Sequence, residues 1–231
     1  MKLLVTGGYG FIGSNFVRHI LKKYPDYEIL NIDALTYAGN PANLRDIKKD
    51  KRYRFAHGRI EDKSLVANAL GDADYIVNFA AETHVDRSIR SSSPFLATNV
   101  LGTHTLLEAA RKVPLKKFVH ISTDEVYGAL GNKGKFTEKT MLAPNSPYSA
   151  SKASADLLIR AYYETYKLPV VIVRPSNNYG YYQFPEKFIP LMITNLLTKK
   201  PIPIYGKGEN VRDWCFVGDT CAAIDSVMHS G

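Results

Sequence analysis

Thr6-Gly7-Gly8-Tyr9-Gly10-Phe11-Ile12-Gly13 is the segment from which the architecture of this chain can be predicted. It follows a short apolar run at residues 2–6, which predicts a buried strand, and it leads into a helix. The apolar face of that helix carries Phe16, Val17, Ile20 and Leu21. Glycines at these spacings permit a tight turn, a close approach of pyrophosphate to backbone, and close packing of helix on strand. The free N–H groups at the start of the helix favour an anion. The segment therefore predicts a dinucleotide-binding unit.

A second strand is predicted at Glu28-Ile29-Leu30-Asn31-Ile32-Asp33, and it ends in an acidic residue twenty positions after Gly13. A carboxylate at this point can accept hydrogen bonds from a ribose diol and repels a 2′-phosphate. Asp33 therefore favours NAD over NADP. Asp33 could instead be an ordinary aspartate at the end of a strand. A glycine motif alone is weak evidence for a dinucleotide site, and here it is supported by the strand and helix around it.

The remainder of the first three quarters of the chain alternates between strand and helix patterns. Strands are predicted at 53–57, 75–79, 117–121 and 168–174, and helices at 62–70, from Ser93-Pro94 onward and at 147–166. Such alternation predicts an α/β fold with a doubly wound parallel sheet and helices on both faces. Ala80-Ala81 follows the strand at 75–79, and two small residues there would let a cofactor lie close to the backbone.

From Pro175 the character of the sequence changes. We predict a polar and aromatic loop at 176–185, an amphipathic helix at 187–198, a short strand at 201–206 and a last helix from Asp219 to about His229. We expect residues 1–174 to form a Rossmann-like NAD-binding domain that includes the catalytic residues. Residues 175–231 would form a partial substrate-binding cap, whose last helix packs back on that domain.

Candidate catalytic residues follow the strand predicted at 117–121, in the segment Ser122-Thr123-Asp124-Glu125. Chemistry in open α/β sheets lies at the carboxyl ends of the strands. Further on, Ser146-Pro147 predicts a helix start, with the serine as N-cap and the proline at the first helical position. Tyr148 and Lys152 are then four residues apart on one face of that helix. Because an ammonium group favours the phenolate, the pair predicts a base that is usable near neutral pH.

Each of these features also has a simpler interpretation. A Tyr-x-x-x-Lys pair arises on many helices by chance, and Asp124-Glu125 could be a solvated turn. The order of the features along the chain favours function: a glycine turn, an acidic strand end, a Ser-Thr pair after a later strand and then the Tyr/Lys pair. We therefore predict a site for proton and hydride transfer.

Composition excludes several other classes of function. The chain has 231 residues and a net charge of +8, but its lysines occur as scattered pairs without interleaved aromatics, which argues against nucleic-acid binding. The six histidines and two cysteines show no metal-ligand spacing, so we expect no metal. No run approaches the ~20 apolar residues of a membrane span, and no secretory signal is seen. We expect a cytoplasmic protein.

Taken together, these motifs resemble those of the extended short-chain dehydrogenases/reductases, in particular the nucleotide-sugar 4,6-dehydratase branch of the NAD-dependent epimerase/dehydratase family. The resemblance covers essentially the whole chain. It is carried by TGGYGFIGSNF at 6–16, AAETHVDRSI at 80–89, STDEVYG at 122–128, YSASK at 148–152, NNYG with QFPEK within 177–187, and YGKGENVRDW at 205–214.

The resemblance implies a hydro-lyase that uses NAD to convert dTDP-glucose to dTDP-4-dehydro-6-deoxyglucose, a step in deoxysugar (rhamnose) biosynthesis. Tyr148, helped by Lys152, would remove the 4-hydroxyl proton while hydride passes to NAD. Glu125 would then take the C5 proton, and Asp124 would protonate the departing 6-hydroxyl. Thr123 would orient the 4-hydroxyl.

Binding residues are also implied by the resemblance. Cofactor contacts are expected from Gly7, Gly10, Phe11, Ile12, Gly13, Asp33, Ala34, Leu35, Thr36, Ile60, Phe79, Ala80, Ala81, Thr98, Tyr148, Lys152 and Asn178. Substrate contacts are expected from Thr83, Thr123, Asn177, Lys187, Tyr205 and Arg212. A homodimer formed through the helices at about 94–112 and 147–166 is implied as well.

Some positions depart from the family pattern. Arg59 stands where an acidic residue is usual and cannot accept a hydrogen bond from adenine, while Gly218 and Thr220 replace an acidic residue and a histidine. The family's chains also continue well beyond the point that corresponds to Gly231. We therefore expect a truncated form that binds NAD but turns over weakly. Two other readings stay open, an NAD-dependent nucleotide-sugar epimerase or decarboxylase and a non-catalytic NAD-binding module. The nucleotide base (dTDP, UDP, CDP or GDP) is also open.

Overall fold

A computed structural model describes residues 1–130, 134–204 and 206–230 of the chain. Its centre is a sheet of parallel strands in the order β3-β2-β1-β4-β5-β6. The strands are β1 (Lys2–Thr6), β2 (Glu28–Asp33), β3 (Tyr53–His57), β4 (Tyr75–Asn78), β5 (Lys117–Ile121) and β6 (Val170–Val173). This order confirms the predicted doubly wound α/β fold. The strand order reverses between β1 and β4, which is where such sheets bind their ligands.

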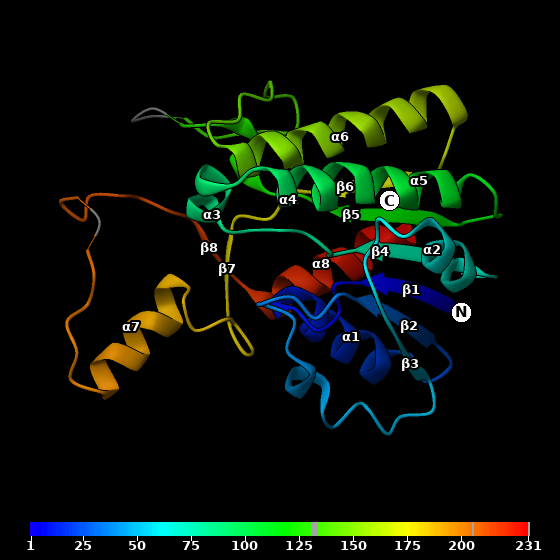
Figure 1. Ribbon diagram of the computed structural model, residues 1–231, viewed down its shortest axis with the longest axis horizontal. Helices are drawn as coiled ribbons and strands as arrows, with labels where there is room; N and C mark the ends of the chain where they lie inside the picture. The colour runs from blue at the N-terminus through cyan, green and yellow to red at the C-terminus, as the bar shows by residue number, and fades with distance from the viewer. Residues whose placement is uncertain (131–133, 205, 231) are drawn as a thin grey trace.

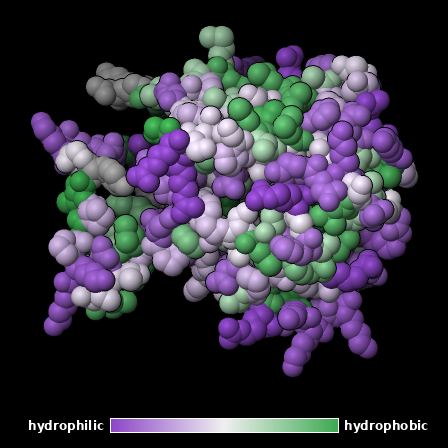
Figure 2. Space-filling view, in the orientation of Figure 1, coloured by the Kyte–Doolittle hydropathy of each residue, from purple (hydrophilic) through white to green (hydrophobic). Residues whose placement is uncertain are grey.

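Helices cover both faces of the sheet (Figure 1). One face packs on α1 (Phe11–Lys23) and α8 (Val217–Ser230), and the other on α2 (Lys63–Leu70), α5 (Thr103–Ala110) and α6 (Pro147–Tyr166). Helix α6 starts as predicted, because the Ser146 hydroxyl accepts a hydrogen bond from the Ser149 N–H in a capping box. Figure 2 shows apolar side chains gathered where α6 runs along the outside of the molecule.

The segment between β4 and β5 differs from the prediction of one helix that begins at Ser93. The structure has α3 (Val85–Arg90), α4 (Ser93–Phe95) and a π-helical turn η2 (Leu96–Gly102) before α5. In η2 the buried Asn99 side chain bonds the backbone of Glu82 and the hydroxyl of Ser151. These contacts join α6 and the loop after β4, so no local sequence pattern announces them. Short 3₁₀ turns, η1 (Pro41–Leu44) and η3 (Asp124–Tyr127), lie in the loops after β2 and β5.

The segment after β6 was only partly predicted. The helix expected at 187–198 is present as α7 (Phe188–Leu197), and it stands away from the main body in Figure 1. Within the expected loop, β7 (Asn177–Tyr179) pairs in parallel with β8 (Trp214–Phe216). The prediction of a strand at 201–206 was wrong, because residues 201–204 have no regular structure. Pro201 and Pro203 lack the backbone N–H groups that a strand uses for pairing.

Helix α8 is joined to α1 by a buried carboxylate. The side chain of Asp225 is 1% exposed and accepts hydrogen bonds from Lys23 Nζ at 2.6 Å, His19 Nε2 at 2.9 Å and the Tyr24 hydroxyl at 3.0 Å. Burial alone would raise the pKa of Asp225, but the hydrogen bonds from Lys23 and His19 hold it below the ordinary value. The last helix is therefore anchored in the layer of the first.

We predict that Asp225→Asn lowers the free energy of unfolding by about 2–4 kcal/mol, because it leaves charged donors without their carboxylate. The folded-state pKa is depressed, so the carboxylate's contribution is present above the unfolded value of about 3.9 and is lost as pH falls through the folded value. Urea unfolding at neutral pH and at acidic pH measures both effects. The exposed Glu164→Gln on α6 is the control, and an equal loss in both variants would contradict the anchoring role.

Candidate active site

A cavity of about 440 Å³ opens at the carboxyl ends of the central strands. Most of the residues predicted for the site line it. They are Gly7, Gly10, Phe11, Ile12, Gly13, Asp33, Ala34, Thr36, Ile60, Phe79, Ala80, Ala81, Thr83, Thr98, Thr123, Glu125, Tyr148, Lys152, Asn177, Asn178 and Lys187. Residues far apart in the sequence meet there because parallel strands end at one edge of the sheet.

Three of the predicted residues that the structure describes are not on the cavity wall. Among the described residues, the cavity wall lacks Leu35, Asp124 and Arg212. Leu35 has a φ of +50° and packs against the core beside α1, so its side chain turns away from the cavity. The exposed Arg212 guanidinium donates to the carbonyl of its neighbour Val211. Tyr205 lies outside the described residues.

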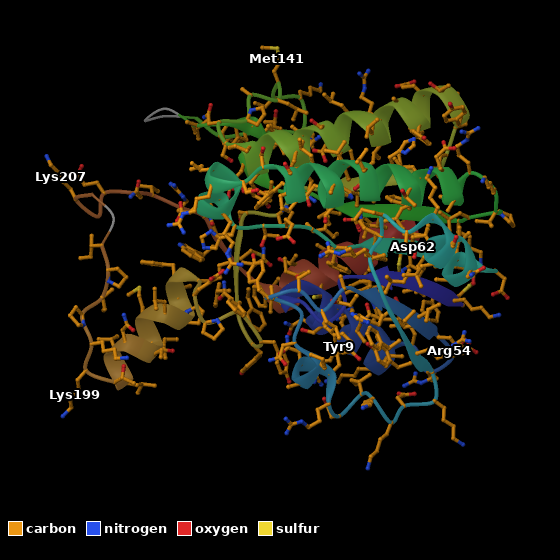
Figure 3. All side chains as sticks on the ribbon, in the orientation of Figure 1. Tyr9, Arg54, Asp62, Met141, Lys199 and Lys207 are labelled. Atoms are coloured by element: carbon orange, nitrogen blue, oxygen red, sulfur yellow. The ribbon has the colours of Figure 1, made fainter. Side chains whose placement is uncertain are left out.

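The glycine turn brings three backbone segments together. Gly7 has a φ of +69°, and a Cβ on it would lie 2.7 Å from the nitrogen of Ala80. A Cβ on Gly13 would lie 2.3 Å from the carbonyl of Gly7, so α1 packs directly on the turn. The ring of Tyr9, labelled in Figure 3, packs against Phe55 on β3 with 4.9 Å between the ring centroids, and this contact fixes the turn against the sheet. The first-turn N–H groups of α1, which have no intrahelical partners, therefore lie beside the cavity.

Asp33 braces the loop that follows β2. Its carboxylate accepts hydrogen bonds from the backbone N–H of Tyr9 at 2.9 Å and of Leu35 at 2.8 Å. Burial raises the pKa of Asp33, and these two N–H groups oppose the rise. Each carboxylate oxygen keeps a second lone pair. The residue can therefore also accept hydrogen bonds from a ligand hydroxyl in the cavity.

The cavity wall carries polar atoms that lack partners. Glu61 Oε2, Asn178 Oδ1 and Gln183 Oε1 are buried and make no hydrogen bond in the described part of the chain, yet all three residues line the cavity. Buried acceptors without donors are costly, and a ligand that offers hydroxyl or amino donors would satisfy them. Together with the open N-terminus of α1 and the small residues beside it, the wall fits a dinucleotide.

Tyr148 and Lys152 share one face of α6 at the end of the cavity, and both are buried. Burial lowers the pKa of Lys152 to about 8, opposed by Asp156. Its ammonium group donates to the carbonyl of Ile121 at 2.6 Å. Burial raises the pKa of Tyr148, as does Glu125, while a hydrogen bond with Thr123 lowers it. Burial is the dominant influence on the pKa of Tyr148, and the Lys152 ammonium is engaged by the carbonyl of Ile121 on β5. That Lys152 makes Tyr148 more acidic stays a prediction.

The carboxylates of η3 take different positions. The Thr123 hydroxyl donates to Asp124 Oδ1 at 3.2 Å, whereas Glu125 lies on the cavity wall. Burial raises the pKa of Glu125, and the nearby Asp124 raises it further, while Lys187 opposes the rise. Burial also raises the pKa of Asp124. Glu125 is therefore a carboxyl group that can both take up and release a proton beside Tyr148.

Several wall residues were missed by the sequence reasoning. They include Tyr37, Glu61, Glu82, Gln183, Phe184 and Trp214. Tyr37 stacks under the Arg87 guanidinium, 3.7 Å from ring centroid to Cζ, and Arg87 also pairs with Glu186 at 3.3 Å. Apart from Trp214, which begins β8, these residues belong to loops of mixed polarity. The only signal in the sequence was their position after strand ends, which does not tell which side chains face inward.

Two further classes of site were examined. Among residues 1–130, 134–204 and 206–230 there is no group of three or more His, Cys, Asp or Glu residues that could hold a metal ion. In the same ranges no helix has both the length and the apolar composition that crossing a membrane requires.

A glycine turn at the switch point of the sheet, with Tyr148 and Lys152 on the wall of one cavity, defines a dinucleotide-dependent short-chain dehydrogenase/reductase. A family model described as GDP-mannose 4,6 dehydratase matches residues 4–231. The chain belongs to this family of extended short-chain dehydrogenases/reductases.

Individual relatives are similar over nearly all of the chain. Low-salt glycan biosynthesis protein Agl12 of Haloferax volcanii is 53% identical over 100% of this chain and 74% of its own length. The dTDP-glucose 4,6-dehydratase of Xanthomonas campestris pv. campestris strain B100 is 51% identical over 99% of this chain and 68% of its own length. A crystal structure of the dTDP-glucose 4,6-dehydratase DesIV of Streptomyces venezuelae, with NAD and TYD bound, superposes with a TM-score of 0.96 at 54% identity. It covers 100% of this chain and 73% of that one.

Proposed function

We propose that this chain is a hydro-lyase that uses NAD to convert dTDP-glucose to dTDP-4-dehydro-6-deoxyglucose, a precursor of deoxysugars. The observation that carries the proposal is Glu125 on the same cavity wall as Tyr148. An epimerase or a decarboxylase needs no second proton-transfer group beyond the tyrosine. A dehydratase needs one, because it removes a proton from carbon as well as from oxygen.

The residues that would hold the cofactor are Gly10 and Gly13 at the start of α1, with Asp33 toward the ribose and Ala80 beside the backbone. When bound there, NAD supplies a hydride acceptor that can return the hydride to the same sugar. The N–H groups of the first turn of α1 meet the pyrophosphate. Asn177 and Lys187 meet the sugar diphosphate, and burial lowers the pKa of Lys187 while the neighbouring Glu186 and Glu125 keep it up. Thr83 lines the same end of the cavity.

Tyr148 takes the proton of the sugar's 4-hydroxyl group, which Thr123 orients. Loss of the C4 hydrogen as hydride completes the oxidation to a 4-ketone. The ketone acidifies the hydrogen at C5, and Glu125 accepts that hydrogen as a proton. The C6 hydroxyl then leaves as water and a C5–C6 double bond forms. A carboxyl group whose pKa is raised by burial and by the neighbouring Asp124 is a stronger base than an exposed one, which suits this proton abstraction. The role of Asp124 as the acid at the C6 oxygen stays a prediction.

We predict that Glu125→Gln lowers the rate of 6-deoxy product formation by roughly 10²–10⁴-fold, since general acid–base catalysis contributes about that much. Incubation of dTDP-glucose in D₂O, followed by mass spectrometry, reports both loss of water and exchange at C5. The variant should show neither.

Two controls sharpen this experiment. Glu138→Gln changes an exposed carboxylate on the loop before α6 and should leave the product rate unchanged. A 4-epimer as the wild-type product would replace the dehydratase by an epimerase. Product formation by Glu125→Gln at the wild-type rate would remove Glu125 from the mechanism.

We also predict that NAD binds more tightly than NADP, because Asp33 repels a 2′-phosphate. Asp33→Asn removes this charge while it keeps the size of the side chain, so the preference should narrow. Titration calorimetry with both cofactors measures it. Equal affinity of the wild-type chain for NAD and NADP would contradict the assignment of Asp33.

We further propose that the chain forms a homodimer through α6 and the helices from α4 to α5. In support, large apolar side chains are exposed there: Leu157 is 57% exposed, Tyr163 50% and Leu101 60%. Apolar side chains gather along α6 in Figure 2 as well.

Leu157→Glu places a charge in the proposed interface and should shift the protein from dimer to monomer. Sedimentation velocity measures the change. Leu197→Glu is the matched control on α7, where the leucine is 80% exposed and far along the chain from the interface. A monomeric wild type, or a dimer that Leu157→Glu leaves intact, would contradict the proposal.

A further inference from the structure

The segment that follows β3 forms one end of the cavity wall. Gly58, Arg59, Ile60 and Glu61 all line the cavity. The backbone N–H of Gly58 donates to the carbonyl of Asp33 at 3.1 Å. This end of the wall therefore lies directly beside the aspartate that the proposed function assigns to the ribose.

The two ends of the cavity suit different halves of a dinucleotide. Lys152 contacts the carbonyl of Ile121 on β5, and Tyr148 lies one helical turn away from Lys152 on α6. In the order of the sheet, β5 and β3 stand on opposite sides of the switch point between β1 and β4. The pyrophosphate belongs at the start of α1, between these two ends. Because the nicotinamide must lie near Tyr148, the adenine belongs at the end formed by the segment after β3.

The backbone is fixed on both sides of Glu61. Ile60 is 2% exposed and packs in the core on the α2 side of the sheet, so closely to Gly102 that a Cβ there would lie 2.6 Å from Ile60 Cδ1. Asp62, labelled in Figure 3, caps α2 by accepting a hydrogen bond from the N–H of Ser64 at 2.9 Å. Glu61 is thus carried between a core residue and a helix cap, which is a rigid support for a binding group.

The carboxylate of Glu61 has room for a further hydrogen bond. Its Oε1 accepts one from the Thr98 hydroxyl at 2.9 Å. Its Oε2 is buried and accepts none within residues 1–130, 134–204 and 206–230. The guanidinium of Arg59 approaches Oε1 only to 3.8 Å, which is beyond hydrogen-bond length. A buried carboxylate oxygen without a donor is costly, so a ligand that brings a donor to this end of the cavity gains by the contact.

The donor that suits this carboxylate is an exocyclic amino group. An ionised carboxylate accepts hydrogen bonds and donates none, and adenine carries an amino donor at C6. Arg59 cannot take the same role, because a guanidinium offers only donors. The last torsion of a glutamate side chain is soft, so either oxygen of Glu61 can turn to the base while the other keeps Thr98. A base with a carbonyl at C6 would instead set its lone pairs against those of the carboxylate.

We propose that Glu61 determines the specificity of the site for the adenine base of the cofactor. Its carboxylate accepts a hydrogen bond from the adenine amino group and disfavours a base that carries a carbonyl in that place. The accepting group thus stands two positions after Arg59, the position where the resembling family usually has an acidic residue. The inference rests on the proposed function only in taking NAD as the cofactor, and it holds equally for an epimerase with the same cofactor.

The test compares NAD with nicotinamide hypoxanthine dinucleotide, in which a carbonyl oxygen replaces the adenine amino group. Titration calorimetry without sugar gives the ratio of the two dissociation constants. The wild-type chain should favour NAD by roughly 10–100-fold, the range expected for a hydrogen bond to a charged group. Glu61→Gln should narrow this preference by about tenfold, because an amide can offer its oxygen to the amino group or its nitrogen to the carbonyl. The two bases also differ at N1, but that difference is the same for both proteins.

Glu82→Gln is the matched control, because Glu82 is a second carboxylate on the same wall and also lies near Arg59. It should leave the preference between the two dinucleotides unchanged. Both ligands are titrated into one preparation of each protein, so an unfolded fraction cancels from the ratio. Equal affinity of the wild-type chain for the two dinucleotides would overturn the proposal, as would an unchanged preference in Glu61→Gln or an equal narrowing in Glu82→Gln. Failure of dTDP-glucose turnover is a separate outcome, because no sugar is present in this experiment.

Discussion

The close approach of Gly7 to Ala80 is the constraint on which the rest of the site depends. With a Cβ at position 7 only 2.7 Å from the next strand's backbone, β1 and the end of β4 could not meet as they do. The contact places the end of β4 beside the N-terminus of α1, and the cavity lies at this switch point, where the strand order reverses. It also brings the Ala80 N–H to within 3.3 Å of the Thr6 hydroxyl oxygen, which accepts a hydrogen bond from it.

Burial then sets the chemistry of the cavity. It moves acids and bases in opposite directions, raising the pKa values of Asp33 and Glu125 and lowering that of Lys152. The pKa values of these acids and of the lysine, which ordinarily lie far apart, are thereby brought closer together. Proton transfer between groups of similar pKa costs less free energy. The hydrogen bond from Thr123 partly offsets the effect of burial on Tyr148.

The segment after β6 contributes both to the cavity wall and to the helix layer that contains α1. Strands β7 and β8 pair with each other and bring Asn177 and Trp214 to the cavity wall, while α8 returns to α1 through Asp225. This part of the cavity wall is therefore connected to the main sheet before β7 and to the layer of α1 after β8. Helix α7 lies between them with large apolar side chains exposed, among them Leu197 at 80%.

Local signals in the sequence were sufficient for the strands of the main sheet, the glycine turn, the cap of α6 and the Tyr148/Lys152 spacing. Each of these depends on residues close together in the chain: periodicity, the conformational freedom of Gly7, or the N-cap of Ser146. The π-helical turn η2, the β7–β8 pair and the packing of Leu35 against the core were decided by contacts between distant segments. So was the contact of His120 with Asn78, which lies on a strand that is its neighbour only in the folded sheet. Directions of hydrogen bonds and shifts of pKa follow from burial and partners, and those exist only once the tertiary structure has formed.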